Sequence, residues 1–136
     1  MMTNESICVY NKFVDKETRS TKYQSIVIPK VYWEESKAVN VIASGLENAD
    51  SLKTIIPKSV IDNLNKKYVT PKEFKALSDY DRKDYFTLGI GDRITQGSNI
   101  YNIEELDKKV EAYTITKVDH KFFGSYYLQH IEIGAN

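Results

Sequence analysis

Residues 112–133 run AYTITKVDHKFFGSYYLQHIEI and contain the most convincing hairpin pattern in the chain. β-Branched and aromatic residues dominate both halves of it, and Gly124 and Ser125 separate the halves. Such residues favour strands, and a glycine between two strand-forming runs favours a turn. The pattern predicts a hairpin made of two strands, residues 112–120 and 126–133.

The same signals occur earlier in the chain. β-Branched and aromatic runs predict further strands at residues 6–13, 23–33, 38–43, 51–57 and 93–95. Loops or turns are expected in the polar or glycine-containing stretches at residues 15–19, 44–50, 89–92 and 96–99. Pro29 interrupts one of the strands. Because proline has no amide hydrogen, that strand must bulge at Pro29 or lie at a sheet edge.

Two short helices are expected between the strands. Thr70 can cap the first amides of a helix, Pro71 suits its first turn, and Glu73 can reach back to the cap, so a helix is predicted at residues 71–77. The polar cluster at residues 78–84 should end it. A second helix is predicted at residues 104–110, and residues 58–68 mix helical spacing with turn-forming residues.

The composition is that of an ordinary globular protein. Apolar residues make up 41% of the 136 residues, which fits a single domain spanning residues 1–136. Lys plus Arg and Asp plus Glu each total 19, so the net charge does not favour a protein that wraps polyanions. One cysteine fits a reducing compartment. We expect synthesis in the cytoplasm and no membrane partner, because the sequence has neither a signal-peptide pattern nor an apolar run of roughly 20 residues.

The histidines and the cysteine do not match a metal or nucleophile motif. His120 and His130 lie toward the ends of the predicted hairpin strands, where they could approach each other, but a metal site needs further ligands at matched spacing. Ile7 and Val9 flank Cys8, which favours a buried thiol inside a strand over a nucleophile with a base beside it. We predict no metal site and no cofactor.

Other polar motifs are better explained by structure than by chemistry. Residues 89–92 (GIGD) lack the third glycine and the Lys-Ser/Thr ending of a phosphate loop, so a tight turn is expected. Asp79, Asp81 and Asp84 lack the glycine and glutamate of a calcium loop and are expected in a solvated loop. Nucleophile-elbow surroundings are missing at Ser59, Ser78, Ser98 and Ser125. No catalytic residue is predicted, although distant segments can still assemble a polar site.

Ten tyrosines are the one compositional excess. Tyrosine is common in β-sheets, and it is also common at interfaces where its ring is buried and its hydroxyl is hydrogen-bonded. The strongly basic pairs are Lys66-Lys67 and Lys108-Lys109. Oligonucleotide-binding sheets combine aromatic residues with a basic groove, and here the aromatic residues occur without a clear basic stripe.

The final third contains a distinctive set of turn and strand motifs. Gly91-Asp92-Arg93-Ile94 is followed by Gln96-Gly97 and Tyr101, and then by the strands YTITKV (113–118) and YLQHIEI (127–133). This set resembles small phage neck proteins of the head-closure or head-tail connector kind. Segments at residues 7–18, 31–33 and 44–51 also resemble an uncharacterised family encoded in phages and prophages of clostridia and their relatives, and that similarity spans nearly the whole chain.

The resemblance implies a mainly β fold, a small antiparallel β-barrel or sandwich with one or two short helices. It further implies a ring of copies in the virion, between the portal or adaptor and the tail, with packaged DNA passing through the lumen without sequence-specific binding. A ring subunit needs two complementary surfaces, and the loops at residues 13–21 and 44–50 are candidates for neighbour contacts. Two alternatives remain: another tail or baseplate component, and a binder of single-stranded nucleic acid that uses the tyrosines.

Overall fold

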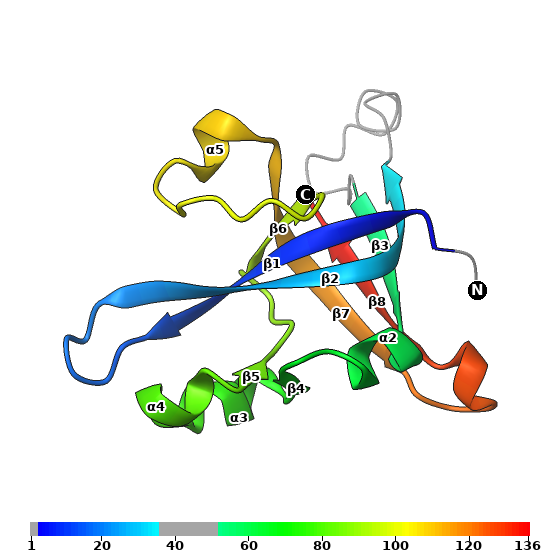
Figure 1. Cartoon of the computed structure of the whole chain (residues 1–136), viewed down its shortest axis with the longest axis horizontal. Coiled ribbons are helices and arrows are strands. Elements are labelled where there is room, and N and C mark those ends of the chain that lie inside the picture. Colours follow the sequence, from blue (N-terminus) through cyan, green and yellow to red (C-terminus); the bar gives the residue numbers. More distant parts are fainter. Residues whose placement is uncertain (1–2, 36–51) are drawn as a thin grey trace.

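Six antiparallel strands form a closed barrel in the computed structural model, which describes residues 3–35 and 52–136 (Figure 1). The strands are β1 (Glu5–Val14), β2 (Thr21–Glu35), β3 (Leu52–Pro57), β6 (Arg93–Gln96), β7 (Ala112–Lys121) and β8 (His130–Ala135). They pair in the order β1-β2-β3-β8-β7-β6, and β6 pairs with β1 to close the ring. The predicted mainly β fold with short helices is confirmed.

Alternate side chains of the strands fill the barrel. Ile7 and Val9 of β1 pair with Ile28 and Ile26 of β2, and all four are buried, because residues directly opposite each other share a face of the sheet. Other strands complete this core with Leu52, Ile56, Ile94, Ile115, Ile131 and Ile133. Burial of each such side chain contributes roughly 1.5–3 kcal/mol, so the core is the main source of stability.

β2 contains an irregularity at Pro29. Glu5 pairs with Val31 whereas Ile7 pairs with Ile28, so β2 has one more residue than β1 over this interval. The extra residue forms a bulge, which accommodates a proline that cannot donate a hydrogen bond to the neighbouring strand. Of the two alternatives expected at Pro29, a bulge or a sheet edge, the structure shows the bulge. Beyond it, β2 goes on to pair with β3.

β1 and β2 extend past the barrel as a two-stranded arm, residues 12–23, which is long and blue in Figure 1. At its end, the carboxylate of Asp15 accepts hydrogen bonds from the amides of Glu17 and Thr18 and from Lys22 Nζ at 2.9 Å. These contacts close the loop that was predicted at residues 15–19. The loop is shorter than the candidate contact segment at residues 13–21, because β1 continues to Val14 and β2 begins at Thr21.

The chain between β3 and β6 forms short elements that lie below the barrel and the arm in Figure 1. These are α2 (Lys58–Asp62), β4 (Lys67–Tyr68), α3 (Pro71–Ala76), α4 (Asp79–Arg82) and β5 (Tyr85–Phe86). The predicted capping box between Thr70 and Glu73 starts α3. α3 ends before the polar cluster at residues 78–84, as predicted, but the loop expected around Asp79 and Asp81 is wrong, because the Ser78 hydroxyl caps a further helix, α4.

The final third contains one more helix and a short 3-10 turn. α5 (Leu106–Lys109) lies within the predicted helix at residues 104–110. The hairpin of β7 and β8 is confirmed, but the predicted strand start at residue 126 is wrong, since η1 (Tyr126–Leu128) precedes β8. The predicted strand at residues 38–43 and the loop at residues 44–50 lie outside the described residues.

Candidate interaction surfaces

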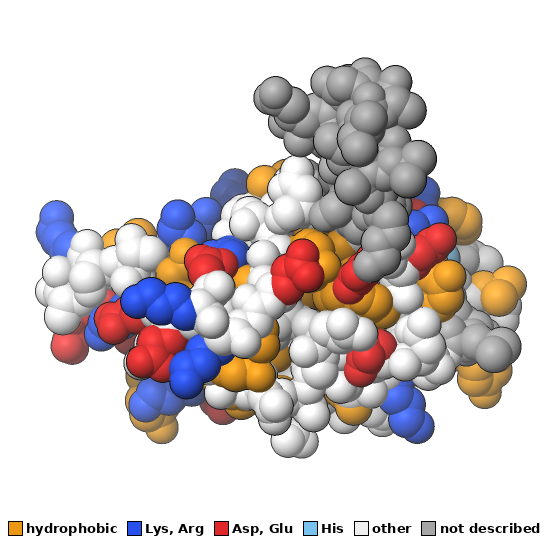
Figure 2. Space-filling model, turned by 90° about the horizontal axis from the view of Figure 1, so that it is seen from above, with side chains coloured by type: hydrophobic (Ala, Val, Ile, Leu, Met, Phe, Trp, Pro, Cys, Tyr) orange, Lys and Arg blue, Asp and Glu red, His pale blue; other side chains and the backbone are white. Residues whose placement is uncertain are grey.

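The turn between β7 and β8 exposes five large apolar side chains within seven residues. We call this group the aromatic tip: Phe122, Phe123, Tyr126, Tyr127 and Leu128. Phe123 is 70% exposed and Tyr127 is 79% exposed. In Figure 2, hydrophobic side chains gather at the right-hand end of the molecule, the end at which η1 lies in Figure 1. A contiguous exposed apolar patch is typical of an interaction site.

Contacts at its base hold the tip in one shape. Tyr126 Oη donates a hydrogen bond to Asp62 Oδ2 on α2 at 2.7 Å, and this bond, together with Lys58, holds the pKa of Asp62 below its ordinary value. Lys58 Nζ also lies 5.4 Å from the ring centre of Phe122. Gly124 has a φ of +78°, which residues with a side chain rarely adopt. A preorganised surface of this kind loses little conformational entropy on binding.

The two histidines lie on opposite faces of the hairpin. His120 pairs with Ile131, and His130 pairs with Lys121, so the two imidazoles point to different sides of the sheet. His120 Nε2 lies 2.7 Å from Tyr68 Oη, whereas His130 contacts a carboxylate of its own strand. The strands therefore do not bring the two imidazoles together, and the expected approach is wrong.

A second surface is a hollow of about 330 Å³ between the arm, α3 and the turn before β6. We call it the arm hollow. Its apolar wall consists of Phe13, Val14, Pro71, Phe74 and Ile90. Lys12 and Lys75 also line it, and both are exposed to solvent. The hollow can receive an apolar side chain beside two cations.

The buried side chain of Asp92 holds the wall of the arm hollow in place. The predicted turn at residues 89–92 is confirmed, but its last residue is buried and accepts hydrogen bonds from Asn11 Nδ2 at 2.9 Å and from the amides of Lys12 and Gly89. Burial raises the pKa of Asp92, and these donors oppose the rise. Asn11 is 81 residues away in sequence, so the chain pattern gave no sign of this contact.

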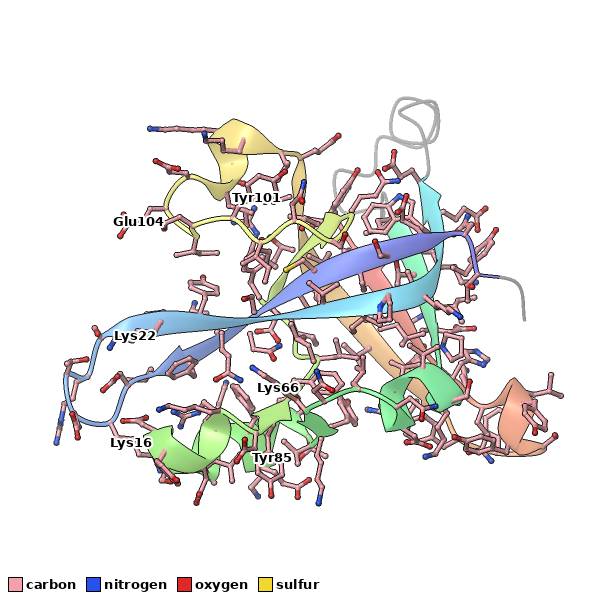
Figure 3. All side chains as sticks on the ribbon, in the orientation of Figure 1. Lys16, Lys22, Lys66, Tyr85, Tyr101 and Glu104 are labelled. Carbon is pink, nitrogen blue, oxygen red and sulfur yellow. The ribbon has the colours of Figure 1, made fainter. Side chains whose placement is uncertain are left out.

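Arg82 fixes α3 and α4 beneath the arm. Its guanidinium is buried, donates a hydrogen bond to Asp79 Oδ1 at 2.6 Å and lies 4.5 Å from the ring centre of Phe13. Lys16, labelled beside α4 in Figure 3, donates from Nζ to the carbonyl oxygen of Ala76 at 3.1 Å. The expectation that the acidic cluster is only a solvated loop is wrong for Asp79, because it holds this buried cation.

Cys8 lies under a cover that we call the α5 cap, residues 101–110. Cys8 and Tyr10 point out of the barrel, and the cap covers them with Tyr101, Ile103, Leu106 and Val110. The amide of Tyr101 donates to Tyr10 Oη at 2.9 Å, and burial raises the pKa of Tyr10 to about 12. Figure 3 shows Tyr101 on the side of the cap facing β1, and Glu104 at its outer edge. The predicted buried thiol is confirmed.

The two basic pairs lie in different places. Lys66 and Lys67 border a shallow hollow of about 350 Å³ at the base of the aromatic tip, together with Lys58 and Phe122. Burial lowers the pKa of Lys66. Lys108 and Lys109 lie on α5. Three lysines, Lys58, Lys66 and Lys67, therefore lie on one side of the base of the tip.

The six paired strands define a small antiparallel β-barrel protein, and the candidate surfaces lie on the segments that connect and extend these strands. The chain belongs to a family of unknown function, DUF6751, whose model matches residues 2–136. No curated protein and no solved structure matches the chain. Within residues 3–35 and 52–136, no helix is long and apolar enough to cross a membrane, and no group of three or more His, Cys, Asp and Glu side chains could hold a metal ion.

Proposed function

We propose that this protein is a structural subunit of a phage virion, which forms a ring at the head-tail neck between portal and tail. Two lines support the proposal. The motifs of the final third resemble neck proteins of the head-closure or connector kind, and the barrel with short helices is the fold that this resemblance implies. The role is structural and involves no catalytic step.

The observation that carries the proposal is that one chain has two different apolar surfaces open to contact, one that projects and one that is hollow. A ring of identical subunits needs a pair of distinct complementary surfaces, one on each side of the subunit. The aromatic tip exposes large apolar side chains, and the arm hollow has an apolar wall. Figure 1 places η1 and the arm at opposite ends of the longest axis, as the two sides of a ring subunit require.

The proposal names the partners and the location. Copies of the chain contact each other in the ring, one rim contacts the portal or adaptor, and the other rim contacts tail proteins. Lys plus Arg and Asp plus Glu each total 19, and such a neutral subunit suits a lumen through which packaged DNA passes without sequence-specific binding. The protein is made in the cytoplasm of the bacterial host and ends in the virion.

Electron cryo-microscopy of virions from the phage that encodes this sequence tests the proposal. We expect the barrel, with its arm, to fit density in a ring between portal and tail. Density for the chain in the tail or baseplate would replace this function with the alternative of another tail component. Virions that lack the chain altogether would contradict both functions.

One observation favours a second candidate, binding of single-stranded nucleic acid. The aromatic tip lies beside Lys58, Lys66 and Lys67, and exposed rings next to cations can stack bases and contact phosphates. A labelled oligonucleotide titrated with the protein at low salt, followed by fluorescence anisotropy, tests this candidate. Binding that weakens steeply with salt would support it, and unchanged anisotropy at low salt would remove it.

A further inference from the structure

The aromatic tip and the arm hollow fit each other in size and character. Phe123 and Tyr127 project from the tip, and the hollow offers about 330 Å³. Pockets that take small ligands measure roughly 300–1,000 Å³, so this hollow suits one or two side chains rather than a helix or strand. Phe13 and Phe74 meet edge-on in its wall with ring centres 6.2 Å apart, and aromatic walls favour aromatic guests.

The charges of the hollow also suit an aromatic guest. Lys12 and Lys75 are exposed where they line it, and cations are attracted to the faces of aromatic rings. The chain already makes contacts of this kind within the tip, where Lys58 Nζ lies 5.4 Å from the ring centre of Phe122 and 5.7 Å from that of Tyr126. Electron-rich rings on one surface thus complement cations on the other.

The tip and the hollow of one molecule lie too far apart to meet, because the tip packs on α2 at one end and the hollow opens beneath the arm toward the other (Figure 1). We propose that the aromatic tip of one copy docks in the arm hollow of the next. This inference rests on the proposed assembly of copies and names the contact between them. Because the contact uses different surfaces on its two sides, it can continue from copy to copy, and it gives a ring where the rotation between neighbours closes.

Two charge substitutions at exposed positions test the contact. Phe123→Asp disables the tip, and Ile90→Asp disables the hollow; their side chains are 70% and 76% exposed, so folding should be unaffected. Sedimentation velocity at protein concentrations up to about 1 mM should show the unmodified chain growing beyond a dimer, since even a weak contact forms there. Each variant alone should associate about a hundredfold more weakly, because Phe123→Asp removes the ring that fills the hollow, and Ile90→Asp places a carboxylate against the electron-rich rings of the tip.

An equimolar mixture of the two variants identifies the arrangement. Phe123→Asp keeps an intact hollow, and Ile90→Asp keeps an intact tip, so the mixture can form one productive contact per pair. We expect heterodimers that grow no further. A symmetric tip-to-tip dimer would behave differently, because Ile90→Asp would then dimerise by itself and mixing would not restore Phe123→Asp.

Tyr80→Asp is the matched control. Tyr80 is 78% exposed on α4 and lines neither surface, so this variant should assemble as the unmodified chain does. Three results would each overturn the proposal: an unmodified chain that stays monomeric throughout, unaltered assembly by Ile90→Asp alone, and a mixture without heterodimers.

The contact and the neck location can fail separately. Heterodimers in the mixture, combined with virion density outside the neck, would retain the contact and remove the location. Ring density at the neck without heterodimers would retain the location and overturn the contact. In that second case the virion map would also show what the tip touches instead.

Discussion

The two ends of the molecule are held by different kinds of contact. At the arm end, Asp92 and Arg82 are 4% and 1% exposed, and their hydrogen bonds hold segments that lie outside the barrel core. At the tip end, Tyr126 is 42% exposed, and its bond to Asp62 faces solvent. Loss of a buried bond leaves its partner unpaired, whereas water replaces a lost exposed bond. The contacts at the arm end therefore contribute strongly to the stability of the fold, whereas residues at the tip end can be substituted with little loss of stability.

Arg82→Ala should have the largest effect and would break the arm end directly. The guanidinium donates to Asp79 Oδ1 and to the carbonyl oxygens of Phe74 and Leu77. We expect a loss of about 3 kcal/mol in unfolding free energy, at the lower end for a broken buried ion pair, because Asp79 keeps some contact with water. Urea denaturation measures it. Lys83→Ala, at an exposed neighbouring position, is the control, and a similar loss there would contradict the comparison.

Asp92→Ala should cost about 2 kcal/mol, because it leaves the buried amide of Gly89 and the partly buried amide of Lys12 without their acceptor. Asp92→Asn retains one side-chain oxygen and should cost less. The same denaturation experiment compares the two variants. If Asn were as costly as Ala, both carboxylate oxygens would be needed as acceptors, and one retained oxygen would not be enough to hold the arm.

Gly124→Ala tests the turn at the tip end. The φ of +78° penalises a side chain, while an added Cβ would meet no atom within 4 Å, so the cost is one of backbone conformation alone. We expect about 1 kcal/mol for alanine and less for Gly124→Asn, since asparagine tolerates this conformation better. Thermal unfolding of both variants checks the order, and equal costs would mean that the turn relaxes to another shape.

The smallest effect on stability is expected from Tyr126→Phe, whose consequence is electrostatic. Removal of the hydroxyl should raise the pKa of Asp62 toward its ordinary value of 3.8 and leave the raised pKa of Asp92 unchanged. Carboxyl carbon chemical shifts followed by NMR during an acid titration measure both values. A pKa of Asp62 that stays in place would show that Lys58, not Tyr126, sets it.

The two carboxylates also give opposite pH dependence. The pKa of Asp62 is lower in the folded state, so its contribution to stability is present above 3.8 and is lost as pH falls through the lowered pKa. The pKa of Asp92 is raised, so the folded state takes up this proton first and the contribution of Asp92 improves as pH falls through its raised pKa. Asp92→Asn should therefore remove the gain in stability that protonation of Asp92 gives as pH falls.

Much of the fold could be predicted from local sequence patterns. The strands at residues 6–13, 51–57 and 93–95 match β1, β3 and β6, the capping box at Thr70 follows from side-chain chemistry alone, and the bulge at Pro29 is one of the two alternatives that proline chemistry allows. The sequence pattern does not predict the helix α4, because its cap, Ser78, follows closely on the end of α3 within a cluster of polar residues that also favours a loop. Strand order depended on pairings between distant segments, which no local pattern contains.

The candidate surfaces were less predictable, for two different reasons. The hollow depends on Asp92 meeting Asn11 and on Arg82 meeting Phe13, contacts that only the folded chain creates. The aromatic tip, in contrast, was visible in the sequence as FFGSYYL, residues 122–128. The pattern predicts a strand for Tyr126, Tyr127 and Leu128, because aromatic residues favour strands, and leaves Phe122 and Phe123 in the connection between the strands. Five large apolar residues around a turn glycine are better taken as a sign of an exposed contact.

Because the α5 cap covers Cys8, the only cysteine of the chain, the reaction rate of this thiol reports local opening of the protein. The thiol is fully buried, and burial raises its pKa, so the reactive thiolate is scarce while the α5 cap is closed. A thiol reagent in excess would therefore be consumed at a rate that reports how often this part of the protein opens. The same seclusion allows dyes or spin labels to be attached at cysteines introduced on the tip or the arm, without replacing the native residue.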